Sequence, residues 1–405
     1  MRGRRLKMAT EHEEIKILTL NAWGLHYFAK NIKERFDHIA DEMIIYDIVC
    51  LQEVWSDSDY RMLSDSVRSE LPYSTHYPSG IIGSGLCIFS RYPIMNVFHH
   101  EYRVTHTLKN FSDGEKFAKK GVLAARIELP LSLGFITVFN THINYGRRNN
   151  QFAELMQFMS NIAHNSPVIL CGDFNTEANH HCYSVITKVL KLSDAFIDDP
   201  QPTCDLPGNL YSKSKPSCPT GKRLDYIFYS SEAFDNNCSL EVKSHRLSLS
   251  GNIPTKGFPY SDHEGLEVVF NIIPPKTGPF LHDVITEDSL RSLDAMADEI
   301  NNELVPLQRI YESKNKHLML LWILLVLVSL AVSVLMVLPS VYNGLSSWYL
   351  QILCSLIPSA SWMISMFIFF HTLDSVHMMR GMIANYRQVN LLIDHNRNKQ
   401  KRNNY

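Results

Sequence analysis

The sequence lacks an excess of charge of either sign. The 405 residues include 39 Lys and Arg against 41 Asp and Glu, which gives a formal net charge of −2. Proteins that bind nucleic acids usually carry a basic excess, because Lys and Arg contacts to phosphate supply much of the affinity. We therefore expect no nucleic-acid partner. The length allows one large domain with an additional segment, or two domains.

Paired cysteines are also missing. None of the 8 cysteines forms a C-x-x-C pair, and several lie in apolar runs where a free thiol packs as a small hydrophobic group. The pattern indicates a reducing compartment and no disulfide framework. The basic residues at 1–5 run into an acidic stretch at 11–14 and no apolar segment follows, so a cleaved signal peptide is not expected. No internal repeat is visible.

A short apolar run at 166–170 predicts a buried strand that continues into Cys171-Gly172-Asp173-Phe174-Asn175. Alternate residues at a strand end point to the same side, so Asp173 and Asn175 should share one space at the rim of a sheet. A carboxylate beside a carboxamide suits a hard cation and a phosphate oxygen. The structural alternative is an Asp/Asn turn that closes the strand.

Polar side chains follow other predicted strands in the same way. The apolar runs at 15–20 and 47–51 are followed by Asn21 and Glu53, and the strand at 135–140 leads into His142. A glutamate at the end of an apolar strand needs a partner, which is either a basic rim residue or a metal ion. A lone histidine at such a position is more often structural than catalytic.

The second half of the chain adds Asp225, near the start of a predicted strand at 223–229, and the pair Asp262 and His263, in the loop before a strand at 266–273. Further strands are predicted at 84–94 and 122–129, helices at 32–45, 63–71 and 151–162, and a long loop at 198–219. Strands with interleaved helices in two halves predict an α/β fold, a four-layer α/β/β/α sandwich with the sheets inside.

The C-terminal part predicts a two-helix transmembrane hairpin. Residues 318–338 and 348–370 contain no charged residue, and each run is long enough to cross a hydrocarbon core of about 30 Å. Basic residues precede the first run and follow the second, whereas residues 339–347 between them contain no Lys or Arg, which places the outer flanks and the large domain on the cytosolic side. A buried soluble helix pair is the alternative.

The regions around the two spans complete the predicted organisation. Apolar residues at helical spacing in the linker 276–317 predict an amphipathic helix that kinks or ends before Pro306. A basic tail follows at 371–405. We expect a multi-pass integral membrane protein with a cytosolic N-terminal domain and C-terminus, with the endoplasmic reticulum as the default membrane.

The motifs together have a specific order: L-N-A-W, L-Q-E-V-W, S-G-L-x-x-F-S-R-Y-P-I, N-T-H, C-G-D-F-N, R-L-D-Y-I-F and S-D-H-E. This order resembles the endonuclease/exonuclease/phosphatase superfamily of metal-dependent phosphodiesterases. With the two predicted spans, the chain is similar to neutral sphingomyelinases of the small, membrane-hairpin type. The resemblance covers about residues 12 to 370.

The resemblance implies a catalytic domain at 12–275 that uses Mg²⁺ to hydrolyse membrane sphingomyelin to ceramide and phosphocholine at neutral pH, in sphingolipid catabolism and signalling. Glu53 matches the principal metal ligand, and Asn21 lies near the metal or the phosphate. Asp262 is expected to tune the metal site. Mg²⁺ would stabilise the charge that develops on the ceramide alkoxide.

The resemblance also assigns the catalytic groups. His263 matches the general base that takes a proton from water, and Asp225 matches the carboxylate that orients it. Asp173 and Asn175 are expected to position water and phosphate, and His142 to stabilise negative charge on the phosphoryl oxygens. Asn175 and His142 therefore also bind substrate.

Two departures from the neutral sphingomyelinase pattern concern substrate binding. Where these enzymes often read T-H-L-H, this chain has Asn144 in place of the second histidine. Their Asp-x4-Lys element aligns with Glu115 and Lys120, with Asp113 nearby, so Lys120 is a candidate substrate-binding residue within an altered acid–lysine switch. A solvated charge run is the alternative.

Other functions share parts of this pattern. The substrate could be another lipid, such as ceramide phosphoethanolamine or a lysophospholipid, and a nuclease would use the same catalytic centre. An inositol-phosphate phosphatase usually carries C-D-R where this chain has Arg223-Leu224-Asp225. A catalytically inactive membrane scaffold is disfavoured, since every catalytic position holds a competent side chain.

Overall fold

The computed structural model describes most of the first 273 residues and selected helical segments beyond them. The described residues are 13–26, 28–77, 85–104, 119–130, 133–163, 166–212, 219–230, 238–273, 286–337, 356, 359–367, 378–387, 389–390, 392–394 and 397. The chain divides into two compact units, Met1–Met296 with Gln388–Tyr405, and Ala297–Arg387. The predicted site residues all belong to the first unit.

The first unit contains two six-stranded sheets. The first sheet has the order β11-β12-β1-β2-β4-β3, with β11 at Ser239–Ser248, β12 at Gly265–Ile273, β1 at Glu13–Asn21, β2 at Ile48–Gln52, β4 at Cys87–Ser90 and β3 at Tyr73–His76. The second has the order β5-β6-β7-β8-β10-β9, with β5 at Ile94–Glu101, β6 at Gly121–Glu128, β7 at Phe135–His142, β8 at Val168–Asp173, β10 at Asp225–Tyr229 and β9 at Ser193–Asp194.

Each sheet has one parallel pair at its centre, β1 with β2 and β7 with β8, and the remaining neighbours are antiparallel. The main core lies between the two sheets, where side chains such as Ile17 and Ile88 of one sheet and Leu123 and Ile169 of the other are fully buried. Because these strands are covered on both faces, they read as continuous apolar runs in the sequence.

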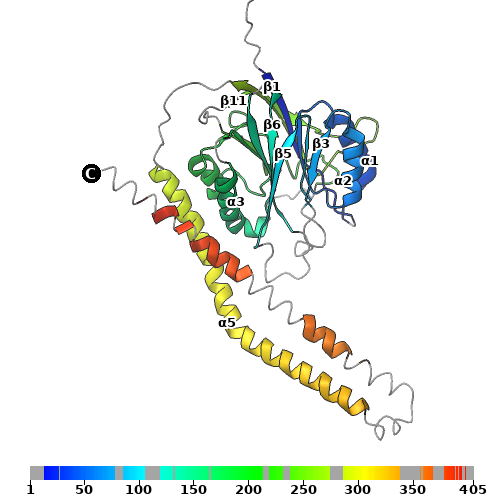
Figure 1. The fold of residues 1–405 in the computed structure, drawn as a ribbon, viewed down its shortest axis with the longest axis vertical. Helices are drawn as coiled ribbons and strands as arrows, with labels where there is room; N and C mark the ends of the chain where they lie inside the picture. The colour runs from blue at the N-terminus through cyan, green and yellow to red at the C-terminus, as the bar shows by residue number, and fades with distance from the viewer. Residues whose placement is uncertain are drawn as a thin grey trace, which may run out of the picture. The chain divides into compact units, whose positions relative to one another are not determined.

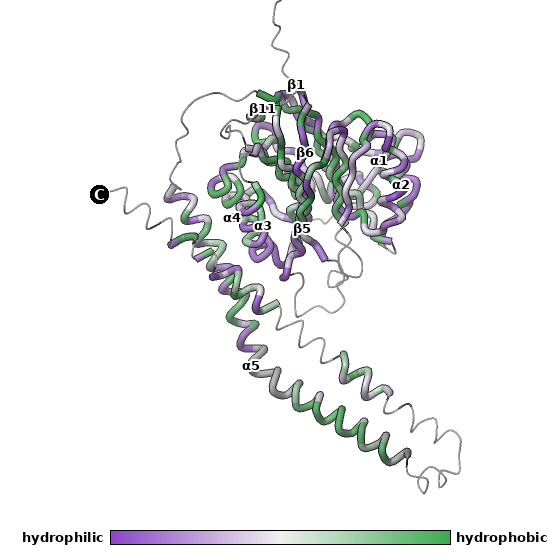
Figure 2. The backbone as a smooth tube through the Cα atoms, in the orientation of Figure 1, coloured by the Kyte–Doolittle hydropathy of each residue, from purple (hydrophilic) through white to green (hydrophobic). Residues whose placement is uncertain are grey.

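Helices cover the outer face of each sheet (Figure 1). Helices α1 (Ile32–Met43) and α2 (Asp57–Val67) pack on the first sheet, and they bury Phe36 and Leu63 among strand residues such as Leu51. Both helices mix hydrophilic and hydrophobic residues along their length, as expected for helices with one buried side (Figure 2).

Helix α3 (Arg148–Ile162) packs on the second sheet through aromatic contacts, including Phe158 with Phe139 of β7. It follows a 3₁₀ turn at Tyr145–Arg147. The short helix α4 (His181–Ser184) continues into a π-helical turn at Val185–Val189. The structure therefore confirms the predicted mixed α/β sandwich of two sheets.

Most predicted elements of the sandwich are confirmed, with two differences. The run at 84–94 is not one strand, because β4 ends at Ser90 and β5 begins at Ile94 in the other sheet. Pro93 lies in the turn between them and fits a chain reversal, since its fixed φ angle suits turns and interrupts strands. Strands β3, β9 and β11 were not predicted.

Helix α5 spans Glu287–Val337 and contains Pro306. Of the two outcomes expected at this proline, a kink or an end, the structure excludes the end. The helix continues through Pro306 into the first predicted span, of which residues 318–337 are helical. Most of the second predicted span lies outside the described residues.

No helix within the described part of the chain is both long and apolar enough to cross a membrane. The structure thus gives no support for the predicted transmembrane hairpin.

Gly172 is required by the close approach of two strands beside the site. Its φ angle is +135°, and a Cβ atom there would lie 1.9 Å from the carbonyl oxygen of Thr141. We expect Gly172→Ala to lower the free energy of unfolding by about 2–4 kcal/mol, because the backbone of β7 would have to shift. The midpoint of urea unfolding measures this loss.

Gly208→Ala is the matched control, since Gly208 also has a positive φ angle of +97° but nothing lies within 4 Å of its added Cβ. It should cost about 1–2 kcal/mol from backbone strain alone. Equal losses for both variants would contradict the steric argument.

Candidate active site

The strand directions bring the predicted residues together at one edge of the sandwich. The parallel pairs end at this edge, where β1 and β7 finish with Asn21 and His142, and Glu53 follows β2. The neighbouring antiparallel strands begin at the same edge, so Asp225 starts β10 and Asp262-His263 precede β12. The predicted site residues at this edge are Asn21, Glu53, His142, Asp173, Asn175, Asp225, Asp262 and His263.

Asp173 lies at the centre of the site. Its Oδ2 accepts a hydrogen bond of 3.0 Å from Asn21 Nδ2 and lies 3.3 Å from His142 Nε2. Its Oδ1 accepts from the backbone N–H of Asn175 at 2.9 Å. Burial alone would raise the pKa of Asp173, but the neighbouring His142, with His263 and Lys120, holds this pKa well below its usual value. Asp173 is therefore an ionised carboxylate surrounded by cationic and amide groups.

Asn175 turns back toward Asp173 and His142. Its φ angle is +47°, a conformation that asparagine tolerates better than most residues. Its Nδ2 donates to the carbonyl oxygen of Ile143 at 3.0 Å and to Asp173 Oδ2 at 3.2 Å, and lies 3.5 Å from His142 Nε2. The expectation that Asp173 and Asn175 share one space is confirmed.

Glu53 is held in an uncommon backbone conformation, with a φ angle of +61°. Gly85 packs against it, and a Cβ atom on Gly85 would lie 3.0 Å from the Glu53 Cα. The carboxylate accepts from Asn21 Nδ2 at 3.1 Å and lies 4.0 Å from His142 Nε2, with 18% of the side chain exposed. This partial exposure leaves Glu53 accessible to an ion or substrate from solvent.

Asp225 and His263 form a buried pair, with 2.8 Å between Asp225 Oδ2 and His263 Nδ1. Burial lowers the pKa of His263, but the Asp225 carboxylate outweighs this effect and raises the pKa well above its usual value. The other ring nitrogen, Nε2, lies 4.0 Å from Asp173 Oδ2. Asp225 therefore orients the imidazole so that Nε2 faces the centre of the site.

Asp262 is a second carboxylate close to Glu53. Burial raises the pKa of Asp262 to about 7, and the negative charge of Glu53 contributes to the shift. Arg35, a residue of α1 that is fully buried, lies near both carboxylates and donates to the carbonyl oxygens of Ala22, Trp23 and Tyr260 at 2.7–2.9 Å. Sequence reasoning missed Arg35, because nothing in its local pattern distinguishes it from a surface residue.

The donor set fits a hard divalent cation. Carboxylate oxygens of Glu53, Asp173 and Asp262 gather beside the Asn21 amide, and oxygen ligands of this kind suit Mg²⁺. Asp173, Asp225 and His263 also offer ligand atoms within 4.8 Å of one another. Asp225 Oδ1 is buried without a hydrogen-bond partner among the described residues, so the site has acceptor capacity that the protein does not satisfy.

The sequence departs from the neutral sphingomyelinase pattern at two places, and the structure gives their residues different surroundings. Lys120 is 7% exposed and close enough to Asp173 to lower the pKa of that carboxyl. Glu115 and Asp113 lie outside the described residues, so the acid–lysine switch stays a prediction. Asn144 is a structural residue, since its side chain accepts from the backbone N–H of Gly146 at the start of the 3₁₀ turn.

A buried amide pair behind the site links the two sheets. Gln52 Nε2 donates to Asn140 Oδ1 at 2.7 Å, and Asn140 Nδ2 donates to the carbonyl oxygens of Leu51 and Cys87 at 2.8 and 2.9 Å. Gln52 directly precedes Glu53, and Asn140 lies two residues before His142. Both residues lie within the sequence motifs, but no role was predicted for them. Amides inside apolar strands are nevertheless a signal for buried hydrogen bonds.

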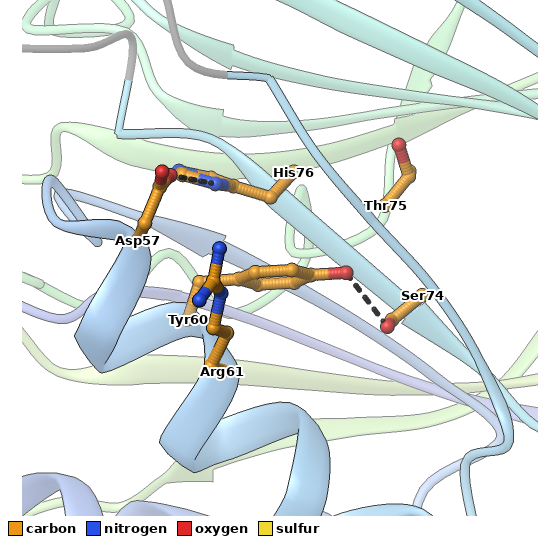
Figure 3. Close-up of a pocket in the computed structure, with 6 residues that line it drawn as sticks. All are labelled: Asp57, Tyr60, Arg61, Ser74, Thr75 and His76. Atoms are coloured by element: carbon orange, nitrogen blue, oxygen red, sulfur yellow. Dashed lines mark hydrogen bonds and ion pairs between the residues drawn. The ribbon is translucent and has the colours of Figure 1, made fainter.

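A separate polar pocket of about 330 Å³ lies between α2 and β3 (Figure 3). It is lined by Asp57, Tyr60, Arg61, Ser74, Thr75 and His76. His76 stacks on Tyr60 with 4.7 Å between the ring centroids, and the Tyr60 hydroxyl bonds to Ser74 Oγ at 2.8 Å. None of the predicted site residues lines this pocket.

Comparison with known proteins gives a consistent picture. Residues 18–263 match the model of the endonuclease/exonuclease/phosphatase family. The chain is 29% identical over 266 residues to a putative neutral sphingomyelinase of Drosophila melanogaster, covering 62% of this chain and 60% of that protein. It is 30% identical over 290 residues to sphingomyelin phosphodiesterase 2 of Homo sapiens, covering 65% and 67%.

A third relative is named for a lipid with a different headgroup. The chain is 27% identical over 300 residues to an inositol phosphosphingolipids phospholipase C of Schizosaccharomyces pombe, covering 64% of this chain and 69% of that protein. The matched part of the chain thus spans between 60% and 69% of the length of these relatives.

Proposed function

Since the chain belongs to the endonuclease/exonuclease/phosphatase family, we propose that it is a sphingolipid phosphodiesterase that hydrolyses sphingomyelin to ceramide and phosphocholine. The observation that carries the reaction type is the Asp225–His263 pair, in which the second imidazole nitrogen, Nε2, lies 4.0 Å from Asp173 Oδ2. The lipid class is supported by the relatives, which are named for sphingomyelin and inositol phosphosphingolipids.

Water is the attacking group, and His263 takes its proton. The hydrogen bond to Asp225 leaves Nε2 directed toward the centre of the site and stabilises the imidazolium that forms. The expelled group is the ceramide alkoxide on the opposite side of the phosphorus. The neutral form of His263 thus converts a weak nucleophile into a useful one without a covalent intermediate.

The remaining side chains hold the phosphate. His142 and the Asn175 amide lie within 3.5 Å of each other and can donate to phosphoryl oxygens, which become more negative in the transition state. Asp173 fixes both of them through its hydrogen bonds and ion pair. Lys120 adds positive charge nearby. These groups therefore bind the transition state more strongly than the substrate.

Mg²⁺ is the cofactor that we propose, held by Glu53 with Asn21 beside it and Asp262 tuning the site. When bound, the ion supplies electrostatic stabilisation of the departing alkoxide. The role of the protein is to keep these oxygens together: Asn21 donates to both Glu53 and Asp173, so it fixes the distance between the two carboxylates.

The headgroup and the membrane are separate parts of the proposal. Phosphocholine is our first choice, and an inositol phosphate headgroup is the second, favoured by the fission yeast relative. We further propose that the chain is anchored in a membrane, by default the endoplasmic reticulum, through the apolar runs at 318–338 and 348–370, with the catalytic domain and C-terminus in the cytosol.

The substrate is tested by headgroup release from mixed micelles at neutral pH. We expect the full chain to release phosphocholine from sphingomyelin with Mg²⁺ and to lose this activity with a chelator, because the donor set is built for a hard cation. Inositol phosphoceramide, ceramide phosphoethanolamine, a lysophospholipid and abasic-site DNA are offered in parallel at equal phosphate concentration.

Release of another headgroup at a higher rate would keep the enzyme class and change the substrate. Cleavage of the DNA without turnover of any lipid would overturn the sphingolipid proposal. Activity that persists in the chelator after exhaustive dialysis would contradict the metal requirement.

A further inference from the structure

A second group of metal-ligating side chains lies at the start of α4, outside the site described above. It consists of the consecutive residues His180, His181 and Cys182, each of which offers a ligand atom within 4.8 Å of the others. The three residues come from different positions of a helix start, with His180 as N-cap and the other two in the first turn. The backbone turn brings their side chains together.

Asn149, at the start of α3, joins the group. Its Oδ1 lies 2.7 Å from His181 Nε2 and accepts a hydrogen bond from Cys182 Sγ at 3.2 Å. Both Asn149 and Cys182 are almost completely buried, whereas the two histidines are half-buried. An ion can therefore reach the group from the histidine side and meet a thiol and a carbonyl oxygen inside.

His180 presents a lone pair toward the group. Its Nδ1 accepts a hydrogen bond of 3.2 Å from the backbone N–H of Cys182. Imidazole binds a metal ion through such a nitrogen lone pair. This lone pair can be given to an ion at the cost of one long hydrogen bond.

The positive charge of Arg148 would repel a cation bound at this group, but its contacts hold the guanidinium elsewhere. Its guanidinium lies over the Tyr145 ring, 4.8 Å from the centroid, and its Nη1 is 3.5 Å from the carbonyl oxygen of Asn175. A thiolate formed at Cys182 would add a compensating negative charge. The net charge of an occupied group therefore does not exceed that of the ion itself.

We propose that His180, His181 and Cys182 form a second metal site, specific for a borderline-soft divalent ion such as Zn²⁺. Imidazole and thiolate are the ligands of Zn²⁺, at bonds of about 2.0–2.3 Å, whereas Mg²⁺ takes oxygen ligands. Asn149 Oδ1 or a water molecule supplies the fourth position. Binding releases the thiol proton to solvent and requires small rotations of the side chains toward the ion.

The site has a structural consequence for the candidate active site. The segment between Asn175 and His180 connects the two, and Arg148, next to Asn149 in the chain, contacts the backbone of Asn175. An ion would connect the starts of α3 and α4 through ligands on both. At a concentration 100 times its dissociation constant it should raise the melting temperature of the protein by about 5 °C.

Co²⁺ is the probe, because a cobalt–thiolate bond gives a charge-transfer band in the near ultraviolet that oxygen and nitrogen ligands do not. The full chain, kept in excess Mg²⁺, is titrated with Co²⁺, and Zn²⁺ is then added. We expect a band that saturates at one ion per chain and disappears when Zn²⁺ replaces Co²⁺. Absence of the band at saturating Co²⁺ would overturn the proposal, whatever the enzymatic activity.

Three variants test whether the band arises from Co²⁺ bound to Cys182 and His180. Cys182→Ser should abolish it, and His180→Asn, which keeps an N-cap acceptor, should weaken Co²⁺ binding by about tenfold or more. Cys204→Ser is the matched control and should keep the band, since Cys204 lies beside His263 in the other site. A band that survives in both Cys182→Ser and His180→Asn, or that is lost in Cys204→Ser, would place the ion elsewhere. If Cys182→Ser does not fold, His180→Asn decides.

Discussion

Replacement of His263 by alanine is expected to lower kcat for headgroup release by about 10²–10⁴-fold, the usual contribution of a general base. His263 is held at 2.8 Å from Asp225, and its other ring nitrogen faces Asp173. No other described imidazole occupies this position: His142, the other histidine of the site, makes its short contacts with Asp173 and Asn175 through Nε2. No other described histidine can therefore readily replace His263 as the general base.

The variant should remain folded. Removal of His263 leaves Asp225 buried without its cationic partner, but burial already raises the pKa of Asp225, so this carboxyl can take up a proton. His263→Gln is a second variant that keeps a donor near Asp225 and cannot act as a base. Both should lose activity alike, and circular dichroism with urea unfolding separates this loss from misfolding.

His38→Ala is the matched control, because His38 lies on α1 with 32% of its side chain exposed and pairs with the exposed Asp41. It should keep full activity. Near-normal rates in His263→Gln would rule out the base assignment, and equal loss in His38→Ala would point to a general defect.

Replacement of Glu53 by glutamine should act mainly through the metal. We expect the Mg²⁺ concentration for half-maximal activity to rise by about 10–100-fold or more, because a charged oxygen ligand is lost while the side-chain volume is kept. Glutamine can still accept the hydrogen bond that Glu53 Oε1 receives from Asn21 Nδ2 at 3.1 Å. The local geometry is therefore maintained and the change is electrostatic.

The measurement is the initial rate of headgroup release over a range of Mg²⁺ concentrations. Glu70→Gln provides the control, since Glu70 is 47% exposed and pairs with Arg91. A Glu53→Gln variant with unchanged Mg²⁺ dependence would exclude Glu53 as the principal ligand. The triad of Asp173, Asp225 and His263, whose ligand atoms lie within 4.8 Å of one another, would then be the next candidate.

The sequence by itself determined the central strands and the polar residues that follow them. The runs at 15–20, 47–51 and 135–140 are apolar because each strand is covered by the other sheet on one face and by helices on the other, and this leaves a clear signal. Asn21, Glu53 and His142 stand out because each ends or follows such a run. Their common location follows from strand direction.

The edge strands carried a weaker signal. β11 alternates between partly buried and exposed residues and contains Lys243 and Arg246, so it does not read as an apolar run. Charged residues on an edge strand are common, because they oppose unwanted pairing with another sheet. The division of 84–94 between β4 and β5 was also hidden, since local pattern does not say which of two sheets a strand joins.

Tertiary structure alone decided which side chains meet. Asp173 and Asp225 are opposite each other because β8 and β10 pair in one register, and a shift by one residue would turn one of them to the other face. His263 reaches Asp225 from 38 positions away, and Arg35 and the Gln52–Asn140 pair contribute from buried positions. Residue types and strand ends are local properties of the sequence, whereas register and the packing of two sheets are set by the folded chain as a whole.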